Sequence, residues 1–310
     1  MPLINVLSDV KPWIGLGIIA GLLIGFDNPD AATILMVVLI AQMTVSLDGI
    51  SFAKSDFKTY DRQILMCVIC CFLINTGFTL LTGLFFIDNT QLWYGWVMLS
   101  SVPCAVSVVV SSLVMKGDAK MSVLGLTVTY VFAIALTPLI THAILGNAVD
   151  PLEILRYILM FIAIPFILTI PLKRVHLKRT PKSLFINLMM FFMVFIGLGS
   201  RRDFILGEPD VIAIVLLACV ARVFAVSIVF LYAFRMMHVA RKDAIVYFVN
   251  IAWKNSGMSI SLTLALFGIL YPNAVLPCIA SLVVESIWFA IMSGLIEKMW
   301  PNDEPEAVPA

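Results

Sequence analysis

Ten apolar segments, most of them close to the length that spans a bilayer, account for most of this chain. A backbone inside lipid must satisfy its own hydrogen bonds, which favours helices. Hydrophobic residues make up 61% of the sequence and charged residues 13%, which is too little charge to cover a soluble domain of 310 residues. The sequence therefore predicts an all-α membrane protein with ten transmembrane helices. The segments are 13–26, 31–47, 64–87, 92–115, 121–145, 152–172, 184–198, 211–233, 244–270 and 274–296.

The lysines and arginines between these segments alternate in density from loop to loop. Basic residues concentrate in cytoplasmic loops, because positively charged segments are hard to translocate. With the N-terminus inside, fifteen of them fall on the cytoplasmic side, and only Arg156, Arg201 and Arg202 fall on the other. A miscounted helix would scramble this alternation. We therefore expect a multi-pass plasma-membrane protein with both termini in the cytoplasm. The absence of an Asn-x-Ser/Thr sequon favours a prokaryotic inner membrane.

The cysteines and histidines give no sign of catalysis. Cys67-x-x-Cys70-Cys71 resembles a metal or redox spacing, but no second ligand pair follows it. All the cysteines lie in apolar segments, which favours free thiols packed as small apolar side chains. An intramembrane enzyme would need a paired aspartate, a Ser–His arrangement or a metal-ligand cluster in the spans, and the sequence shows none. We expect no metal and no cofactor. The six cysteines are Cys67, Cys70, Cys71, Cys104, Cys219 and Cys278.

The ten segments divide into two sets of five, and an odd repeat places the second set upside down relative to the first. We expect inverted repeats at 1–147 and 148–300, followed by a cytoplasmic tail at 301–310. Segments four and nine then correspond, and both contain helix-breaking features: Pro103 in the first and the polar run 250–257 in the second. Broken helices at matching positions of two halves indicate a midplane binding site. The alternative is a proline kink and a satisfied polar cluster.

Three charged residues fall deep within the predicted spans: Arg222, Lys254 and Glu285. A charge at this depth costs at least about 2.5–3.5 kcal/mol, so each needs a partner, a wet cavity or a function. Glu285 is the natural partner of Arg222, which leaves Lys254 unpaired and facing a cavity. Lys254 could then add a fixed positive charge to half-helix N-termini, which attract anions, or it could carry a proton. The sequence alone leaves both roles open.

The chain contains several short motifs: Val-Pro-Cys at 102–104, Lys-Gly-Asp at 116–118, Met-Ser-Val at 121–123, Asn-Ser-Gly at 255–257 and Met-Thr-Val-Ser-Leu at 43–47. These motifs resemble those of the bile acid:sodium symporter family. The resemblance implies a ten-helix fold with a panel domain and a core domain, crossing at the two broken helices. It also implies secondary active transport of organic anions, coupled to two sodium ions.

The residues that the family uses to bind sodium are largely replaced in this sequence. A valine side chain offers no oxygen to a hard cation, and Lys254 places a cation where the family binds one. The resemblance therefore implies a divergent member in which Lys254 replaces a coupling ion. Aligned without gaps, the family's ion ligands fall at Val108, Val109, Leu126, Asn250, Lys254 and Cys71, whereas Ser122 is retained.

Together these features predict a sodium-independent secondary active transporter of a small organic anion, with alternating access around the two breaks. Two alternatives stay open: a sodium-coupled symporter with relocated ion sites, and a metalloid or inorganic-anion efflux carrier with Cys104 as a thiol ligand. The expected partners are an anionic small molecule and the lipid bilayer, without nucleic acid. The predicted substrate-binding residues are Pro103, Cys104, Ser107, Asn250, Lys254, Asn255 and Ser256, and the possible coupling or charge partners are Lys254, Glu285, Arg222 and Ser122.

Overall fold

A computed structural model describes residues 7–48, 54–175 and 177–301, and these ranges contain helices and no strand. The predicted tail at 301–310 lies outside them except for Pro301. Six helical stretches of the described part are long and apolar enough to cross a membrane, which indicates a multi-pass membrane protein. They are Asp61–Phe86, Ala119–Ala148, Pro151–Val175, Thr180–Gly199, Pro209–Met236 and Pro272–Met299.

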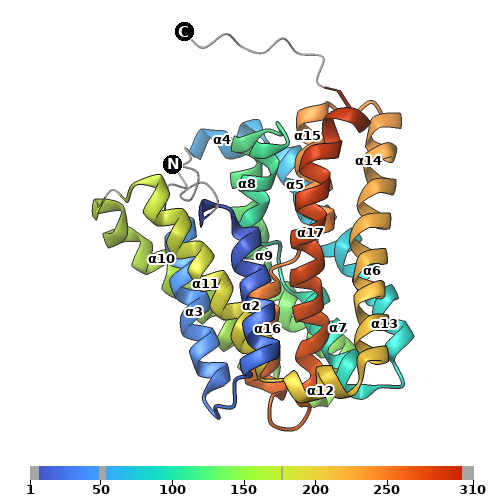
Figure 1. Cartoon of the computed structure of the whole chain (residues 1–310). Coiled ribbons are helices and arrows are strands. Elements are labelled where there is room, and N and C mark those ends of the chain that lie inside the picture. The colour runs from blue at the N-terminus through green and yellow to red at the C-terminus, as the bar shows by residue number, and fades with distance from the viewer. Residues whose placement is uncertain (1–6, 49–53, 176, 302–310) are drawn as a thin grey trace.

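The helices follow one another through short connections (Figure 1). In chain order they are α2 (Val10–Ile24), α3 (Ala31–Leu47), α4 (Lys54–Thr59), α5 (Asp61–Ile69), η1 (Cys70–Asn75), α6 (Thr76–Gly83), η2 (Leu84–Phe86), α7 (Thr90–Ser101), α8 (Ser107–Val114), α9 (Ala119–Leu145), η3 (Gly146–Ala148), α10 (Pro151–Leu172), η4 (Lys173–Val175), α11 (Arg179–Gly199), α12 (Arg202–Gly207), α13 (Pro209–Val220), η5 (Ala221–Ala225), α14 (Val226–Met236), α15 (Arg241–Ala252), α16 (Ser256–Phe267), η6 (Pro272–Val275) and α17 (Leu276–Met299). Of these, η1 and η5 are π-helical, and η2, η3, η4 and η6 are 3₁₀-helical.

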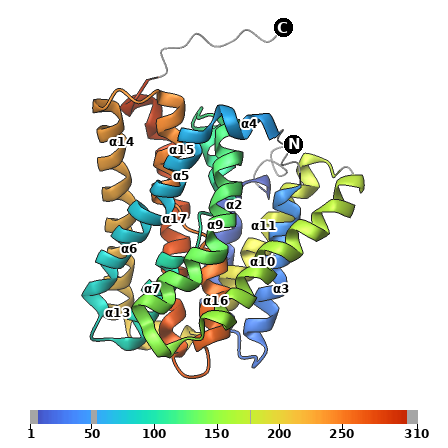
Figure 2. The same cartoon turned by 180° about the vertical axis from the view of Figure 1, so that it is seen from behind.

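Helices α2, α3, α10 and α11 stand together on one side of the molecule (Figures 1 and 2). Helix α11 packs against both α2 and α3, and α10 packs against α3. Two glycines, four residues apart on α2, allow the close contact with α11. A Cβ atom at Gly17 would lie 3.0 Å from the carbonyl oxygen of Phe191, and one at Gly21 would lie 3.1 Å from that of Phe195. Small residues at this spacing are typical of tightly packed membrane helices. We call α2, α3, α10 and α11 the four-helix bundle.

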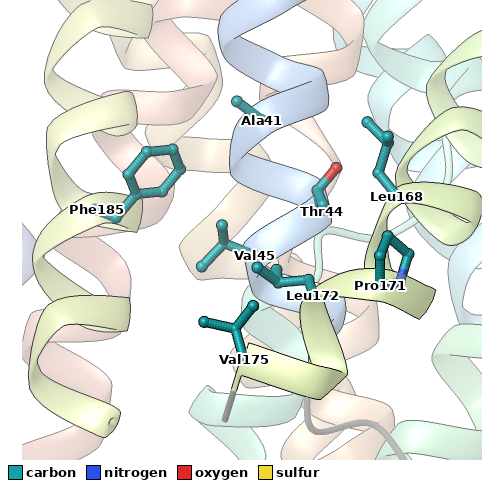
Figure 3. A pocket seen from close by; sticks show the side chains of 8 residues that line it. All are labelled: Ala41, Thr44, Val45, Leu168, Pro171, Leu172, Val175 and Phe185. Carbon is teal, nitrogen blue, oxygen red and sulfur yellow. The ribbon is translucent and has the colours of Figure 1, made fainter. Parts of the chain in front are cut away.

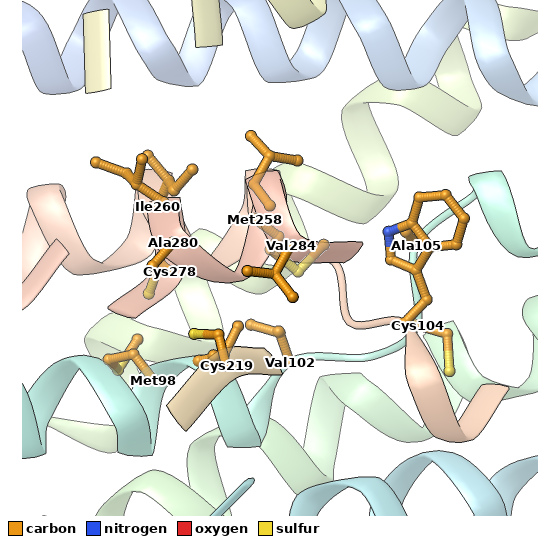
Figure 4. Packing of buried hydrophobic residues seen from close by; sticks show 14 of the residues in the cluster. Met98, Val102, Cys104, Ala105, Cys219, Met258, Ile260, Cys278, Ala280 and Val284 are labelled. Carbon is orange, nitrogen blue, oxygen red and sulfur yellow. The ribbon is translucent and has the colours of Figure 1, made fainter. Parts of the chain in front are cut away.

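The remaining helices form the larger part of the molecule, which contains both broken helices. Helix α7 packs against α6, α9 and α17, and α15 packs against α14. The approach of α7 to the α16–α17 connection is so close that a Cβ atom at Gly95 would overlap the carbonyl oxygen of Ala274. Apolar side chains fill the interior around the breaks. Figure 4 draws part of this packing, including Val102, Cys104 and Met258, all of which are fully buried.

The helices at 90–114 and 241–267 are both interrupted, at the positions that the sequence predicts. Helix α7 ends at Ser101, and Val102 is extended, with φ −73° and ψ 157°. The proline at 103 disfavours helical backbone at the preceding residue and has no N–H to donate. Helix α15 ends at Ala252, and α16 begins at Ser256, where the Asn255 side chain accepts a hydrogen bond from the backbone of Met258 at 3.0 Å.

Candidate functional site

The two breaks cross in direct contact. The backbone N–H of Asn255, in the second break, donates to the carbonyl oxygen of Pro103, in the first, over 2.8 Å. The thiol of Cys104 lies 3.6 Å from the carbonyl oxygen of Asn250, at the end of α15. Because these residues are buried, the crossing forms a polar centre inside an apolar protein. Chain segments about 150 positions apart in the sequence therefore build one site.

Lys254 lies at the centre of this crossing. As expected, no carboxylate pairs with its ammonium group among the described residues, but our expectation that it faces a cavity is wrong. The residue is fully buried, and its Nζ donates to the carbonyl oxygens of Cys71 at 3.0 Å and Val102 at 2.9 Å. A third bond, of 2.9 Å, joins Nζ to Oγ1 of Thr76. An ammonium group has three donors and no acceptor, so all three of its hydrogens have a partner here. The physical reason for the difference is desolvation, because an unpaired buried charge would be far costlier.

Local backbone irregularities provide the acceptors. Val102 is the extended residue that follows α7, so its carbonyl oxygen is free to accept a side-chain donor. Cys71 lies in the π-helical segment η1, and a π-turn changes the usual hydrogen-bond register of a helix. Thr76 donates its own hydroxyl proton to the carbonyl oxygen of Ser100 at 2.7 Å, which directs an oxygen lone pair toward Lys254. The ring of Phe72 adds a cation–π contact 5.4 Å from Nζ.

Glu285 forms the predicted ion pair with Arg222 and also holds the second break. Oε1 of Glu285 lies 2.7 Å from Nη2 of Arg222, and both side chains are at most 1% exposed. The same oxygen accepts hydrogen bonds from the hydroxyl of Ser281 at 3.0 Å and from the backbone N–H of Lys254 at 3.1 Å. Oε2 accepts a 2.6 Å bond from the hydroxyl of Ser256, the first residue of α16. One buried carboxylate therefore binds a guanidinium and two groups of the break.

Arg222 extends the network to the other π-helical segment. It lies in η5, and its Nη1 donates to Oδ1 of Asn75 at 3.0 Å and to Oγ1 of Thr79 at 3.3 Å. Asn75 is the last residue of η1, so the two π-helical segments meet through this bond. With all three charged side chains ionised, the cluster of Lys254, Arg222 and Glu285 carries one net positive charge. Among the residues whose side-chain burial the structure describes, no other charged side chain is buried.

Asparagines connect the crossing to its surroundings. The side chain of Asn250 donates to the carbonyl oxygen of Val246 at 2.8 Å, whereas its Oδ1 is buried and has no partner among the described residues. Asn75 donates to the backbone carbonyl of Asn250 at 3.2 Å. Nδ2 of Asn255 donates to the hydroxyl of Tyr130 on α9 at 3.0 Å. The structure thus brings together six of the predicted binding residues: Pro103, Cys104, Asn250, Lys254, Asn255 and Ser256.

Two predicted residues lie apart from this centre. Ser107 is half-buried at the start of α8, beyond the first break. The hydroxyl of Ser122 lies 3.2 Å from that of Ser112 and 3.4 Å from the carbonyl oxygen of Val108, so it joins α9 to α8. In the described part of the chain, no hydrogen bond connects either residue to Lys254. Ser122 therefore acts here as a packing contact between two helices.

Sequence reasoning missed Thr76 and the backbone oxygens that accept from Lys254. A backbone carbonyl leaves no mark in the sequence, and threonines in membrane helices usually bond their own preceding turn. The polar pair Asn75-Thr76 inside an apolar segment is the sequence feature that could have indicated this part of the site. The π-helical segments had no such signal, because they depend on how helices pack.

Two hollows lie away from the crossing. The first, of about 430 Å³, is apolar and lies between α3, α10 and α11, where Val45, Leu168 and Phe185 line it (Figure 3). The second, of about 450 Å³, is polar and lies beside the ends of α2 and α11. Neither includes Lys254, and the full burial of Lys254 and Asn250 shows that the crossing is closed in this conformation.

Comparison with known proteins gives a match over more than half of the chain. The model of the Sodium Bile acid symporter family matches residues 33–200, a range that runs from α3 to the end of α11. It includes the first break and the acceptors of Lys254, but neither Lys254 itself nor Glu285. A search of curated proteins finds no match.

Proposed function

Because this chain belongs to the Sodium Bile acid symporter family, we propose that it is a secondary active transporter that moves a small organic anion without coupling to sodium. Membership of the family makes the chain a membrane transporter of the bile acid symporter type. Independence of sodium, the class of substrate and the roles of individual residues are the proposed part.

The position of Lys254 is the observation that carries the proposal. Its Nζ donates hydrogen bonds of 2.9–3.0 Å to three neutral oxygens, and oxygen is also the ligand type that a hard cation requires. The resemblance to the family's motifs implies that one of the family's sodium ligands falls at Lys254 itself. A lysine that is covalently part of the protein would supply the positive charge permanently. Under this proposal the carrier needs no ion from solution to reach its substrate-binding state.

The net charge of the crossing supports an anionic substrate. Glu285 already neutralises Arg222, so the charge of Lys254 is balanced only by neutral oxygens. In a desolvated site this excess charge attracts an anion more strongly than it would in water. We therefore propose a small carboxylate as substrate, bound near Lys254 once the carrier opens. Asn250, Asn255 and Ser256 would then provide uncharged hydrogen bonds.

We propose ten spans in two inverted repeats, 1–147 and 148–300. Six long stretches, two shorter apolar helices and two broken helices would make up the ten. The two π-helical segments support this division, because η1 lies in the third span and η5 in the eighth, which are matching positions of the two repeats. Two matching breaks and two matching π-segments are hard to explain without an internal repeat.

The proposed orientation places both termini in the cytoplasm. The connections α3–α5, α8–α9, α10–α11 and α14–α15 lie at the end of the molecule where α2 begins and α17 ends (Figure 1). These connections carry most of the lysines and arginines between helices. During transport, we expect the four-helix bundle to move against the larger part that contains the breaks, which would expose the crossing to each side in turn.

Transport by the purified, reconstituted protein tests the proposal. Uptake of a panel of radiolabelled monocarboxylates and dicarboxylates into proteoliposomes would be measured, with sodium and pH varied independently. We expect saturable uptake of at least one carboxylate, above that of protein-free liposomes, with or without sodium. Uptake of no organic anion from the panel would contradict the proposed substrate class.

A further inference from the structure

The polar hollow opens at the end of the molecule opposite to the start of α2. Its lining comes from the α2–α3 connection, from the end of α11 with α12, and from the connection that leads to α17. It therefore lies where the four-helix bundle meets the larger part of the molecule. A volume of about 450 Å³ is sufficient for a small-molecule ligand. The polar residues in the lining are Asp27, Ser200, Arg201, Arg202, Asp203 and Asn273.

Arg201 is the unusual residue of this lining. Its guanidinium is half-buried, and its Nε is buried without a hydrogen-bond partner among the described residues. Burial lowers the pKa of the Arg201 guanidinium, but an arginine side chain stays protonated in essentially any site. Within the described ranges, no salt bridge joins it to Asp27 or Asp203. The neighbouring Arg202, in contrast, donates its Nε to the carbonyl oxygen of Leu22 at 2.7 Å.

The two aspartates do not cancel this charge within the hollow. Both Asp27 and Asp203 are exposed, whereas Arg201 is half-buried. Water and salt screen exposed charges more strongly than buried ones, so the deeper guanidinium dominates the field inside the hollow. The wall is closely packed, because a Cβ atom at Gly199 would lie 2.9 Å from the backbone nitrogen of Phe26. The connection after α2 therefore lies directly against the end of α11.

We propose that this hollow is an anion-binding vestibule in which Arg201 binds the carboxylate of the transported anion at the outer mouth of the carrier. A guanidinium can bind a carboxylate through two parallel hydrogen bonds, and Arg201 has donors to spare. The identity of the ligand as the substrate rests on the proposed function. The presence of an anion site is independent of the proposed function, since it follows from the hollow and the unpartnered Nε of the Arg201 guanidinium.

An engineered thiol can measure the charge preference of the hollow without any transport. All native cysteines are buried, so Ser200→Cys would place the accessible thiol in the lining. The probes are two methanethiosulfonates, one carrying an anionic sulfonate and one a cationic trimethylammonium group. The measured quantity is the ratio of the labelling rate of the anionic reagent to that of the cationic reagent. We expect this ratio to be roughly tenfold higher on the thiol of the Ser200→Cys variant than on a free thiol in solution.

Matched variants then assign the preference to Arg201. Arg201→Gln in the Ser200→Cys background should abolish the preference, and Arg201→Lys should keep part of it. Arg156→Gln removes the same charge from an exposed position on the same predicted side and should leave the preference intact. Millimolar acetate should slow labelling only where Arg201 is present. An equal preference with and without Arg201 would overturn the proposal.

Uptake kinetics connect the vestibule to transport. With a substrate found in the carboxylate panel, Arg201→Gln should raise KM for uptake from the outside about tenfold with Vmax unchanged, whereas a structural role would lower Vmax. An unchanged KM would overturn the role of the vestibule in substrate capture. The labelling result does not depend on the proposed function. A carrier that transports no organic anion would still show the charge preference, and loss of the preference would leave the proposed role of Lys254 unchanged.

Discussion

The two breaks differ in what they give to the crossing. The first break provides acceptors: the carbonyl oxygen of Val102 binds Lys254, and that of Pro103 binds the N–H of Asn255. Donors come from the second break, where Lys254 contributes both its ammonium group and its backbone N–H. No side chain of the described residues caps α8, whereas Asn255 caps α16. One half of the crossing therefore needs only a proline and exposed carbonyl oxygens, whereas the other half depends on buried charge.

Because its contacts include buried charges, we expect the second break to lose more stability on substitution than the first. Removing a charge there leaves another buried charge without its partner, which is strongly destabilising. Substitutions in the first break leave the backbone acceptors in place, because carbonyl oxygens do not depend on the side chain. Pairs of variants, one in each break, can therefore test whether substitutions in the second break reduce stability or transport more than those in the first.

The largest effect is expected from Glu285→Ala. It would leave Arg222 buried without a counter-charge and free two groups of the second break, so we expect the free energy of unfolding to fall by about 3–5 kcal/mol. Thermal unfolding in detergent would measure the loss. Combining Glu285→Ala with Arg222→Met should recover part of the stability, since it removes the unpaired charge. Wild-type stability in the single variant would show that the carboxylate does not hold the break.

Next in size is the effect of Lys254→Ala on transport. Without the ammonium group, three buried oxygens lose their donor and the site loses its charge, so uptake should fall at least tenfold, or about 1.4 kcal/mol. Lys298→Ala, at an exposed position near the end of α17, is the matched control and should transport normally. Initial uptake rates at equal protein density provide the measurement.

Lys254→Arg separates the two roles left open for this residue. Arginine keeps a fixed charge but does not release its proton, so it should restore part of the transport if only the charge is needed. The three acceptors around Nζ favour that outcome. A variant as inactive as Lys254→Ala, yet folded and stable, would instead support proton transfer at this position.

Helix capping should produce a smaller contrast. Asn255→Ala removes the cap of α16 and the bond to Tyr130, and we expect a loss of about 1 kcal/mol in the free energy of unfolding. Ser107→Ala, at the start of the uncapped α8, should change it by less than about 0.5 kcal/mol. Equal losses in the two variants, measured by thermal unfolding, would mean that the breaks are more alike than their contacts indicate.

The smallest effect is expected from Pro103→Ala. The carbonyl oxygen at position 103 remains available to Asn255, so the crossing keeps its contact. We expect a loss of about 0.4–1 kcal/mol, mainly because alanine leaves the unfolded chain less restricted. Unfolding and uptake measured on the same preparation would check this. A loss as large as that of Glu285→Ala would show that the proline itself maintains the break.

The sequence reveals the parts of this site that depend on residue type. The break at Pro103, the polar run around Asn255 and the pairing of Glu285 with Arg222 all follow from residues that are rare inside a membrane. The partners of Lys254 could not be found this way, because two of them are backbone carbonyls. A lysine without a visible carboxylate partner therefore suggested an open cavity, whereas backbone irregularity at Cys71 and Val102 provides its acceptors.

The fold likewise has features that the sequence predicts and features that it does not. Apolar length and the alternation of basic loops predict the helices, and Pro103 and the polar run 250–257 predict where two of them break. They do not predict η1 and η5, because no particular residue type marks a π-turn and its formation depends on packing against the neighbouring helix. Nor do they predict that Ser122 bonds to Ser112 rather than contributing to the crossing.

Sodium dependence of wild-type uptake shows most directly whether the ammonium group of Lys254 takes the place of a coupling ion. Initial uptake of the best carboxylate would be measured in proteoliposomes as sodium is replaced by potassium or choline at constant ionic strength. We expect the same rate at every sodium concentration, including none. Strong stimulation by sodium, with potassium and choline inert, would contradict it and would mean that ions bind elsewhere in the protein.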